Sequence, residues 1–136
     1  MEKLLSNYSI RDIQLAYIAG FFDGEGMVTL NPRQSEYYLM IRASNNNEKP
    51  LRYMYSVFGC GNVRTVEPKG NRSLSYLWQC FGLEAASVLE QLLPYLQVKK
   101  ELASLGIALV YTSVGKREDI ANKIYELNSL HGKGRR

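Results

Sequence analysis

Two carboxylates separated by one glycine are the side chains in this sequence best suited to chemistry. The run Asp23-Gly-Glu25-Gly directly follows an uncharged stretch, residues 15–22. Carboxylate oxygens are ligands that hard divalent cations such as Mg²⁺ prefer in proteins. If the uncharged stretch is a helix, both acids lie at its C-terminus, where the helix dipole disfavours a carboxylate that has no cation nearby. A conflict of this kind is typical of a functional site.

The stretch that carries the acids predicts a buried helix with two unlike faces. One face is bulky, with Leu15, Ile18 and Phe22 at spacings of three and four. The other is small, with Ala16, Gly20 and Gly24 one turn apart. A helix that is apolar on nearly every side must be covered on more than one side. We therefore expect the small face to take a second helix at close range.

The two ends of this helix also have sequence signals. Ser9 and Asp12 have the spacing of a capping box, so the helix should begin there. Gly24 and Gly26 bracket Glu25, and glycine often ends a helix because it tolerates positive φ. On this interpretation Glu25 points out of the helix end, whereas Asp23 still belongs to the last turn.

The segment Ile18-Ala-Gly-Phe-Phe-Asp-Gly-Glu-Gly26 resembles the LAGLIDADG motif of the homing endonucleases and their maturase relatives. Phe21 and Phe22 occupy its two large apolar positions and Glu25 its second acidic position. Only exchanges of Asp for Glu and of one large apolar residue for another separate this segment from the motif. The alternative interpretation is a core helix with a glycine-rich end.

Periodicity predicts the elements that position the motif. Alternating residues over 27–33 and 37–44 indicate one strand pair, and 62–66 with 73–81 a second pair. Helical spacing is expected over residues 51–58, 83–93, 99–111 and 118–130. The resulting α-β-β-α-β-β-α order is that of a single LAGLIDADG domain. We therefore predict an α+β fold in which helices back a four-stranded antiparallel sheet.

The same patterns predict which side chains form the core. In the middle helix these are Leu51, Met54, Tyr55 and Phe58, and in the last helix Ile120, Ile124, Leu127 and Leu130. In the fourth strand Tyr76, Trp78 and Cys80 should face inward, because alternation places them opposite the polar residues. The Gly59-Cys-Gly61 segment indicates a turn from helix to strand rather than a nucleotide-binding loop.

One face of the predicted sheet has no helix to cover it, and its residue types are unusual. It combines arginines, amides and hydroxyls, which can contact guanine and adenine edges, whereas an ordinary solvent face is more often rich in Lys and Glu. Sequence alone leaves both interpretations open. The polar residues of this face are Thr29, Asn31, Arg33, Tyr38, Arg42, Ser44, Asn62, Arg64, Ser75 and Gln79. Met40, Val66 and Leu77 lie on the same face and could meet thymine methyl groups.

Length and composition limit the remaining choices. The 136 residues fit one domain, and 46% hydrophobic with 22% charged residues is ordinary for a globular protein. A net charge of +4 and a pI near 9.1 permit a polyanionic partner. Two cysteines and one histidine indicate neither a zinc site nor a disulfide framework, and they argue against histidine-metal nucleases and Ser/His/Asp chemistry. The short basic tail, residues 131–136, is expected to be flexible.

We expect the chain to stay in the compartment where it is made. Its apolar runs are shorter than the 18 to 20 residues, roughly, that span a bilayer, so no membrane partner is expected. The N-terminus lacks the features of a signal peptide. The expected location is therefore intracellular, in bacterial or phage cytoplasm or in an organelle that encodes the protein.

The resemblance implies an activity and a metal. Members of the family lay the sheet along the DNA major groove and hydrolyse phosphodiesters of a long pseudo-palindromic site, in the service of intron or intein mobility. The implied cofactor is Mg²⁺ or Mn²⁺, held by the Glu25 carboxylate and the Gly24 carbonyl. One domain offers too few ligands for the metal, and single-motif members are homodimers. The implied interface contains Ala16, Gly20, Gly24 and Asp23, with a structural role for Asp23.

Two further catalytic residues follow from the resemblance. The segment from Leu93 to Lys99 is similar to one in which a family lysine reaches the scissile region, and Lys99 is our choice over the adjacent Lys100. Asn45 stands at the end of the second strand, where the family often has a polar residue that positions water. The alternative function is that of a cleavage-inactive relative, which would act as an intron RNA maturase or a DNA-binding regulator.

Overall fold

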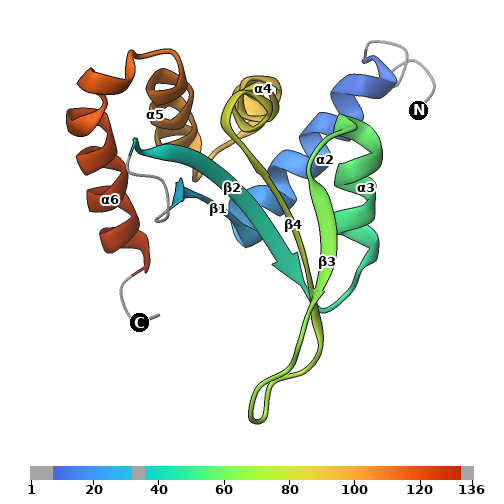
Figure 1. Cartoon of the computed structure of the whole chain (residues 1–136). Helices are drawn as coiled ribbons and strands as arrows, with labels where there is room; N and C mark the ends of the chain where they lie inside the picture. Colours follow the sequence, from blue (N-terminus) through green and yellow to red (C-terminus); the bar gives the residue numbers. More distant parts are fainter. Residues whose placement is uncertain (1–7, 32–35, 133–136) are drawn as a thin grey trace.

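The computed structural model describes residues 8–31 and 36–132, and its order of elements confirms the predicted fold class. The predicted turn at Pro32, the candidate DNA contact Arg33 and the tail residues 133–136 lie outside the described residues. Labels follow Figure 1. The elements are α2 (Ile10–Glu25), β1 (Gly26–Asn31), β2 (Tyr38–Asn45), α3 (Lys49–Phe58), β3 (Asn62–Val66), β4 (Ser75–Phe81), α4 (Gly82–Leu92), η1 (Leu93–Tyr95), α5 (Lys100–Val110), η2 (Val114–Lys116) and α6 (Glu118–Gly132).

The four strands form one antiparallel sheet in the order β1-β2-β4-β3. The register places Val28, Ile41 and Cys80 in one row, and each of these side chains is at most 1% exposed. Helices α2 to α5 pack on this side of the sheet, as Figure 1 shows. The opposite side has no helix across it, so alternation divides the strands into a core face and an open face.

Helix α2 begins where the sequence predicts. The Ser9 hydroxyl accepts a hydrogen bond of 2.9 Å from the Asp12 amide, which satisfies one of the first-turn N–H groups. The bulky face is buried, with Ile18 and Phe22 fully covered and Leu15 7% exposed. The small face is exposed to solvent at Ala16, Gly20 and Gly24.

We expected α2 to end at a glycine with positive φ, and this expectation is wrong. Neither Gly24 nor Gly26 has a positive φ, and Gly26 is extended, with φ of −89° and ψ of 167°. A Cβ at position 26 would lie 2.3 Å from the ring of Phe22, which is fully buried. Glycine is therefore required at position 26 by close packing, not by left-handed backbone. The positive-φ ending does occur in α3, which stops at Gly59 with φ of 70°.

The two outer strands have different surroundings. Helix α6 lies along β1, and the Asn128 side-chain amide donates a 2.9 Å hydrogen bond to the Val28 carbonyl. Strand β3 pairs with β4 on one side only and is mostly exposed. The hairpin of β3 and β4 extends past the rest of the sheet, as Figure 1 shows.

Most of the predicted core is confirmed, with two errors. Trp78 and Cys80 are buried as expected, Tyr76 packs against the core, and the Trp78 indole donates a 3.1 Å hydrogen bond to the Cys60 carbonyl. Tyr55, however, is 45% exposed and Leu130 is 65% exposed. A helical stripe predicts that a face is covered, but it does not show where the covering elements end.

No described helix is long and apolar enough to cross a membrane.

A candidate DNA-cleavage site on the open face of the sheet

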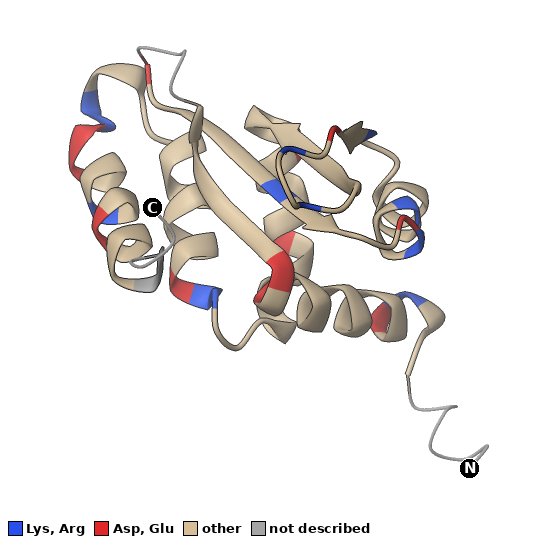
Figure 2. Cartoon of the chain, turned by 90° about the horizontal axis from the view of Figure 1, so that it is seen from below, with Lys and Arg blue, Asp and Glu red and all other residues tan. Residues whose placement is uncertain are grey.

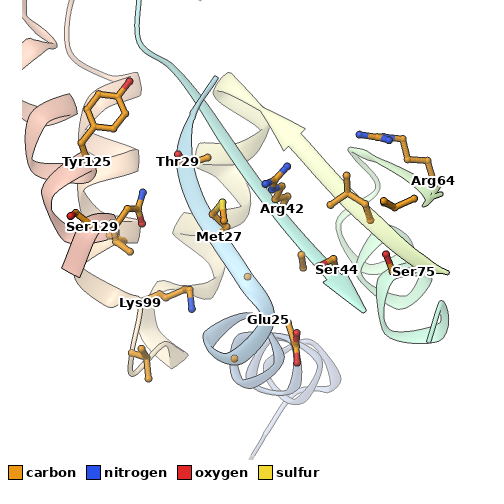
Figure 3. A pocket seen from close by; sticks show the side chains of 18 of the residues that line it. Glu25, Met27, Thr29, Arg42, Ser44, Arg64, Ser75, Lys99, Tyr125 and Ser129 are labelled. Atoms are coloured by element: carbon orange, nitrogen blue, oxygen red, sulfur yellow. The ribbon is translucent and has the colours of Figure 1, made fainter. Parts of the chain in front are cut away.

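A groove of about 1210 Å³ lies on the open face, at the place where α2 passes into β1. Figure 3 shows Glu25 and Lys99 at one end, Arg64 and Ser75 on one side, and Tyr125 and Ser129 on the other. Strand residues, the end of α2, the start of α5 and one face of α6 therefore line a single concave surface. Its lining residues are Gly24, Glu25, Gly26, Met27, Thr29, Arg42, Ala43, Ser44, Arg64, Val66, Arg72, Ser75, Leu77, Val98, Lys99, Leu102, Tyr125, Asn128 and Ser129.

Glu25 is the only acidic side chain among these lining residues. It is the last residue of α2, it is exposed, and Gly24 lies beside it in the same groove. Within residues 8–31 and 36–132 no three Asp, Glu, His or Cys side chains gather into a metal-binding group. The described part of one chain therefore brings one carboxylate to the groove.

Asp23, the other acid of the motif, is bound to the chain segment that precedes α5. Its carboxylate accepts hydrogen bonds from the backbone amides of Gln97 at 2.8 Å, Val98 at 3.1 Å and Lys99 at 3.0 Å. The Lys99 ammonium in turn donates a 2.7 Å hydrogen bond to the Asp23 carbonyl. A cation thus lies at the C-terminal end of α2, where a helix dipole favours one. The three amide donors and the lysine cation thus offset the unfavourable position of the Asp23 carboxylate at the end of the helix.

The structure distinguishes the two candidate lysines. Lys99 lines the groove together with Glu25, whereas Lys100 is the first residue of α5 and is absent from the lining. The sequence choice of Lys99 over Lys100 is therefore consistent with the geometry.

The structure does not bring Asn45 into the groove. Its side-chain oxygen accepts a 2.8 Å hydrogen bond from the Asn47 amide, which forms a turn after β2. Alternation also places it on the core side with Ala43, while its neighbour Ser44 faces the groove. Asn45 is therefore not among the lining residues of the groove, and its role in positioning water stays a prediction.

The register confirms that the predicted polar residues of the described strands share the open face. Met27, Arg42, Gln79 and Asn62 are successive cross-strand partners and form one row across all four strands. Thr29, Arg42, Ser44, Arg64 and Ser75 line the groove itself. Asn31, Tyr38, Met40, Asn62 and Gln79 lie outside its lining, on the rest of the face.

The apolar members of the open face differ in their exposure. Leu77 is only 5% exposed, so the expectation that it meets thymine methyl groups is wrong. It lies between Ser44 and Arg64 in the register. Val66 remains 36% exposed. Tyr38 and Phe81 stack at a centroid distance of 6.3 Å at the far end of the strands.

The charged groups of this surface favour an anionic ligand. Arg42, Arg64, Arg72 and Lys99 line the groove with the single carboxylate of Glu25. Figure 2 shows basic segments on the sheet, in the loop between β3 and β4 and at the start of α5, with an acidic segment where α2 meets β1. A phosphate-rich polymer matches this distribution, since guanidinium and ammonium groups supply most protein contacts to nucleic-acid backbones.

Sequence reasoning missed several lining residues. Arg72 comes from the β3–β4 loop, whose Lys69 and Arg72 gave a local basic signal. Tyr125, Asn128 and Ser129 come from α6, and their helix shows only an amphipathic stripe in the sequence. Their position follows from the packing of α6 against β1, which no local pattern specifies.

The two cysteines do not supply a nucleophile. Both are free thiols, Cys80 buried and Cys60 partly buried, as the sequence indicated. Burial raises the pKa of both thiols, so the reactive thiolate is disfavoured.

The exposed side of α2 is wider than the small stripe found in the sequence. Ile10 is 76% exposed, Ile13 46% and Tyr17 55%, and they continue the line of Gly20 and Gly24 toward the N-terminus. A Cβ added at either glycine would meet no atom of the chain within 4 Å. The chain itself therefore gives no packing reason for glycine at these two positions.

No protein-family profile matches the chain. The DNA endonuclease I-CvuI of Chlorella vulgaris is 29% identical over 107 residues, which are 72% of this chain and 64% of the relative. The match thus spans less than two thirds of that relative's length.

Solved structures share the fold. I-CvuI with a DNA target and Mg has a TM-score of 0.68 at 24% identity, covering 86% of this chain and 83% of that one. The archaeal intron-encoded homing endonuclease I-Vdi141I, complexed with DNA, has a TM-score of 0.68 at 15% identity, covering 85% and 84%. In its motif, its sequence relative and its fold, this chain is similar to the LAGLIDADG homing endonucleases.

Proposed function

We propose that this chain is a site-specific DNA endonuclease that acts as a homodimer on a long pseudo-palindromic site. The observation that carries the proposal is the placement of one exposed carboxylate, Glu25, inside an otherwise basic groove on the open face of the sheet. A surface that only bound DNA would gain nothing from a carboxylate facing phosphates. The DNA complexes of I-CvuI and I-Vdi141I support the choice of double-stranded DNA as substrate.

The open face would contact the major groove, which is wide enough to admit strands of a sheet. Arg42 and Gln79 are directly opposite one another on β2 and β4, and both types of side chain can make paired hydrogen bonds to purine edges. Arg72 lies in the loop beyond the strands, where a cation would contact the DNA backbone. Base reading is thus assigned to the strands and backbone contact to the groove margins.

The residues at the groove end fit a divalent cation only if the site is shared. Mg²⁺ takes oxygen ligands and is usually held by one or two carboxylates with waters and phosphates. This chain would supply the Glu25 carboxylate and the Gly24 carbonyl, and among the described residues no other carboxylate lines the groove. When bound, the metal would activate water and stabilise charge on the phosphate. A second chain would supply the equivalent pair.

Of the basic groups that line the groove, the Lys99 ammonium is the one that we expect to act on the reacting phosphate. It lines the groove beside the last residues of α2, and its bond to the Asp23 carbonyl fixes its position. A cation held there would stabilise negative charge on the phosphate oxygens or orient a water molecule. We assign this role to Lys99.

The second copy would pack on the exposed side of α2. This side combines glycines that permit close backbone approach with the exposed side chains of Ile10, Ile13 and Tyr17. Such an interface would place the C-termini of the two α2 helices, and so the two Glu25 side chains, beside one another. The dimer thereby accounts for both the apolar surface and the single carboxylate of each chain.

The test is a cleavage selection. The protein is incubated with a randomised pseudo-palindromic DNA library and Mg²⁺, and cut molecules are sequenced; Glu25→Gln and Lys100→Gln are run beside the parent. We expect the parent and Lys100→Gln to enrich one site. Glu25→Gln should bind that site as tightly as the parent, or more tightly, because a charge facing the phosphates is lost, and should not cut it.

Two results would contradict the proposal. Cleavage by Glu25→Gln at the parent rate would remove Glu25 from the catalytic site. A parent protein that binds a site but cuts it with neither Mg²⁺ nor Mn²⁺ would instead favour a maturase or a DNA-binding regulator.

A further inference from the structure

We infer that Asp23 is a positioning residue for Lys99, so that the first acid of the motif acts on cleavage through the lysine. The inference rests on the proposed function. It differs from a purely structural role because it assigns Asp23 a defined effect on one catalytic side chain.

Hydrogen bonds join Asp23 to Lys99 at both the backbone amide and the ammonium group of the lysine. The Asp23 carboxylate holds the Lys99 backbone amide at 3.0 Å, together with the two preceding amides. The Asp23 carbonyl holds the Lys99 ammonium at 2.7 Å. A long, flexible side chain is thereby fixed at its root and at its tip by one residue, which lies two positions before Glu25.

This arrangement sets the distance between the two groups that the proposed reaction uses. Lys99 is far from the motif in sequence, 76 positions from Asp23. Without the carboxylate, the three amides before α5 would lose their common acceptor and the lysine would no longer be held against the end of α2. A displacement of about 1 Å at a catalytic group can cost on the order of 100-fold in rate.

The chain contains a matched tether for comparison. Asp12, on the same helix, accepts a 2.7 Å hydrogen bond from the Tyr95 hydroxyl and so fixes the η1 turn just before the Asp23 contacts. Loss of this bond loosens the same connection without touching Lys99. Tyr95→Phe, which removes the donor, is therefore the control for a general loss of stability.

The experiment is a double-mutant cycle on the site that the parent selects. Single-turnover cleavage rates are measured with DNA already bound, for the parent, Asp23→Asn, Lys99→Met and the double variant. We expect each single variant to be slower by on the order of 100-fold. The double variant should match Lys99→Met within about twofold, since two residues that act through one group are not additive. The effect of Tyr95→Phe on the rate should instead multiply with that of Lys99→Met.

A second measurement does not depend on cleavage. The rate at which an amine-acylating reagent modifies Lys99 is followed by mass spectrometry of peptides, in the absence of DNA. The rate of modification should rise in Asp23→Asn and stay at the parent value in Tyr95→Phe. If Asp23→Asn does not fold, Asp23→Ser replaces it, because a serine hydroxyl can still accept one of the amide hydrogen bonds.

The outcomes separate the inference from the proposed function. Rates that multiply in the cycle, with unchanged labelling of Lys99, overturn the positioning role and leave the nuclease in place. A parent that cuts no DNA overturns the proposed function, and the labelling result then decides the positioning role alone.

Discussion

The ring of Phe22 lies so close to the backbone at position 26 that only glycine fits there without a clash. Any Cβ there would lie within 2.5 Å of three ring atoms, and the ring is fully buried. We expect Gly26→Ala to lower the free energy of unfolding by about 1–3 kcal/mol, as overpacking of a tight core does. Urea denaturation checks this. Gly115→Ala is the control, since a Cβ there meets nothing within 4 Å, and an equal loss in both variants would contradict the packing argument.

The hydrogen bond between Tyr95 and Asp12 gives a second prediction at the scale of the residue. The Tyr95 hydroxyl lowers the pKa of Asp12 below its usual 3.8, and the Asp12 carboxylate raises the pKa of Tyr95 above its usual 10.0. The Asp12 contribution to stability is present above pH 3.8 and is lost as pH falls through the lower folded value. The Tyr95 contribution is present below pH 10.0 and is lost as pH rises through the higher folded value.

Tyr95→Phe should therefore have a flatter profile of unfolding free energy against pH at both ends. Chemical denaturation at a series of pH values from acid to alkaline measures both profiles. Parallel profiles for the parent and Tyr95→Phe would show that the bond does not form in solution.

Individual residues were predicted from the sequence to different degrees. The motif identified Glu25, because an acid between two glycines is an uncommon pattern that resembles a known family. It could not identify Gln97 and Val98, whose backbone amides bind Asp23, because a backbone contact leaves no trace in residue type. It also did not show that Ser44, rather than Asn45, lines the groove, because one position along a strand exchanges the two faces of the sheet.

At the scale of the element, the open face of the sheet predicts how DNA recognition is divided. Arg42 lies in a row with Gln79 and Asn62, whereas Arg64 lies one row nearer the β3–β4 loop. Replacing an arginine that reads a base by alanine should cost about 1–3 kcal/mol of binding free energy. It should also relax the sequence preference at that base pair. We expect this of both Arg42→Ala and Arg64→Ala.

Lys69→Ala is the matched control for this prediction, because Lys69 lies in the loop beyond the strands. It should weaken all sequences alike and reduce the salt dependence of binding, as expected for a phosphate contact. Affinity and preference are measured by competition binding at several salt concentrations. Unchanged preference after replacement of both arginines would show that another surface reads the DNA.

Elements themselves were largely predictable. The alternation of residue types predicted all four strands to within two residues at the described ends. Glycine and proline marked the boundaries of α3 and α4. The order of strands in the sheet did not follow from periodicity, since each strand pattern is compatible with several neighbours. The placement of β4 between β2 and β3 arises from packing of the whole core.

For the whole molecule, the exposed side of α2 predicts self-association. Gly20→Leu places a large side chain where a partner helix would approach, while no atom of the same chain opposes it. We expect the parent to sediment as a dimer at micromolar concentration and Gly20→Leu as a monomer with unchanged thermal unfolding of its own core. Gly115→Leu, at another open glycine, should remain dimeric. A monomeric parent would contradict the proposed interface.

The groove is a property of the whole molecule that the sequence showed only in part. Its sheet floor followed from alternation, but its α6 wall depends on the contact between Asn128 and the Val28 carbonyl, 100 positions apart. The hydrogen-bonding capacity of an asparagine is the same in a loop, a cap or an interface. Its sequence position therefore did not reveal that it joins a helix to the edge of a sheet.

The difference between the two outer strands has a practical consequence for work with the purified protein. The backbone of β1 is shielded by α6, whereas β3 pairs on one side only, and its five residues include a single charge, on Arg64. An unprotected strand of low charge is a template on which another molecule can add its own strand. Aggregation during concentration or storage is thus expected to start at β3, and bound DNA, by occupying the adjoining face and the arginine, should lengthen the shelf life of the preparation.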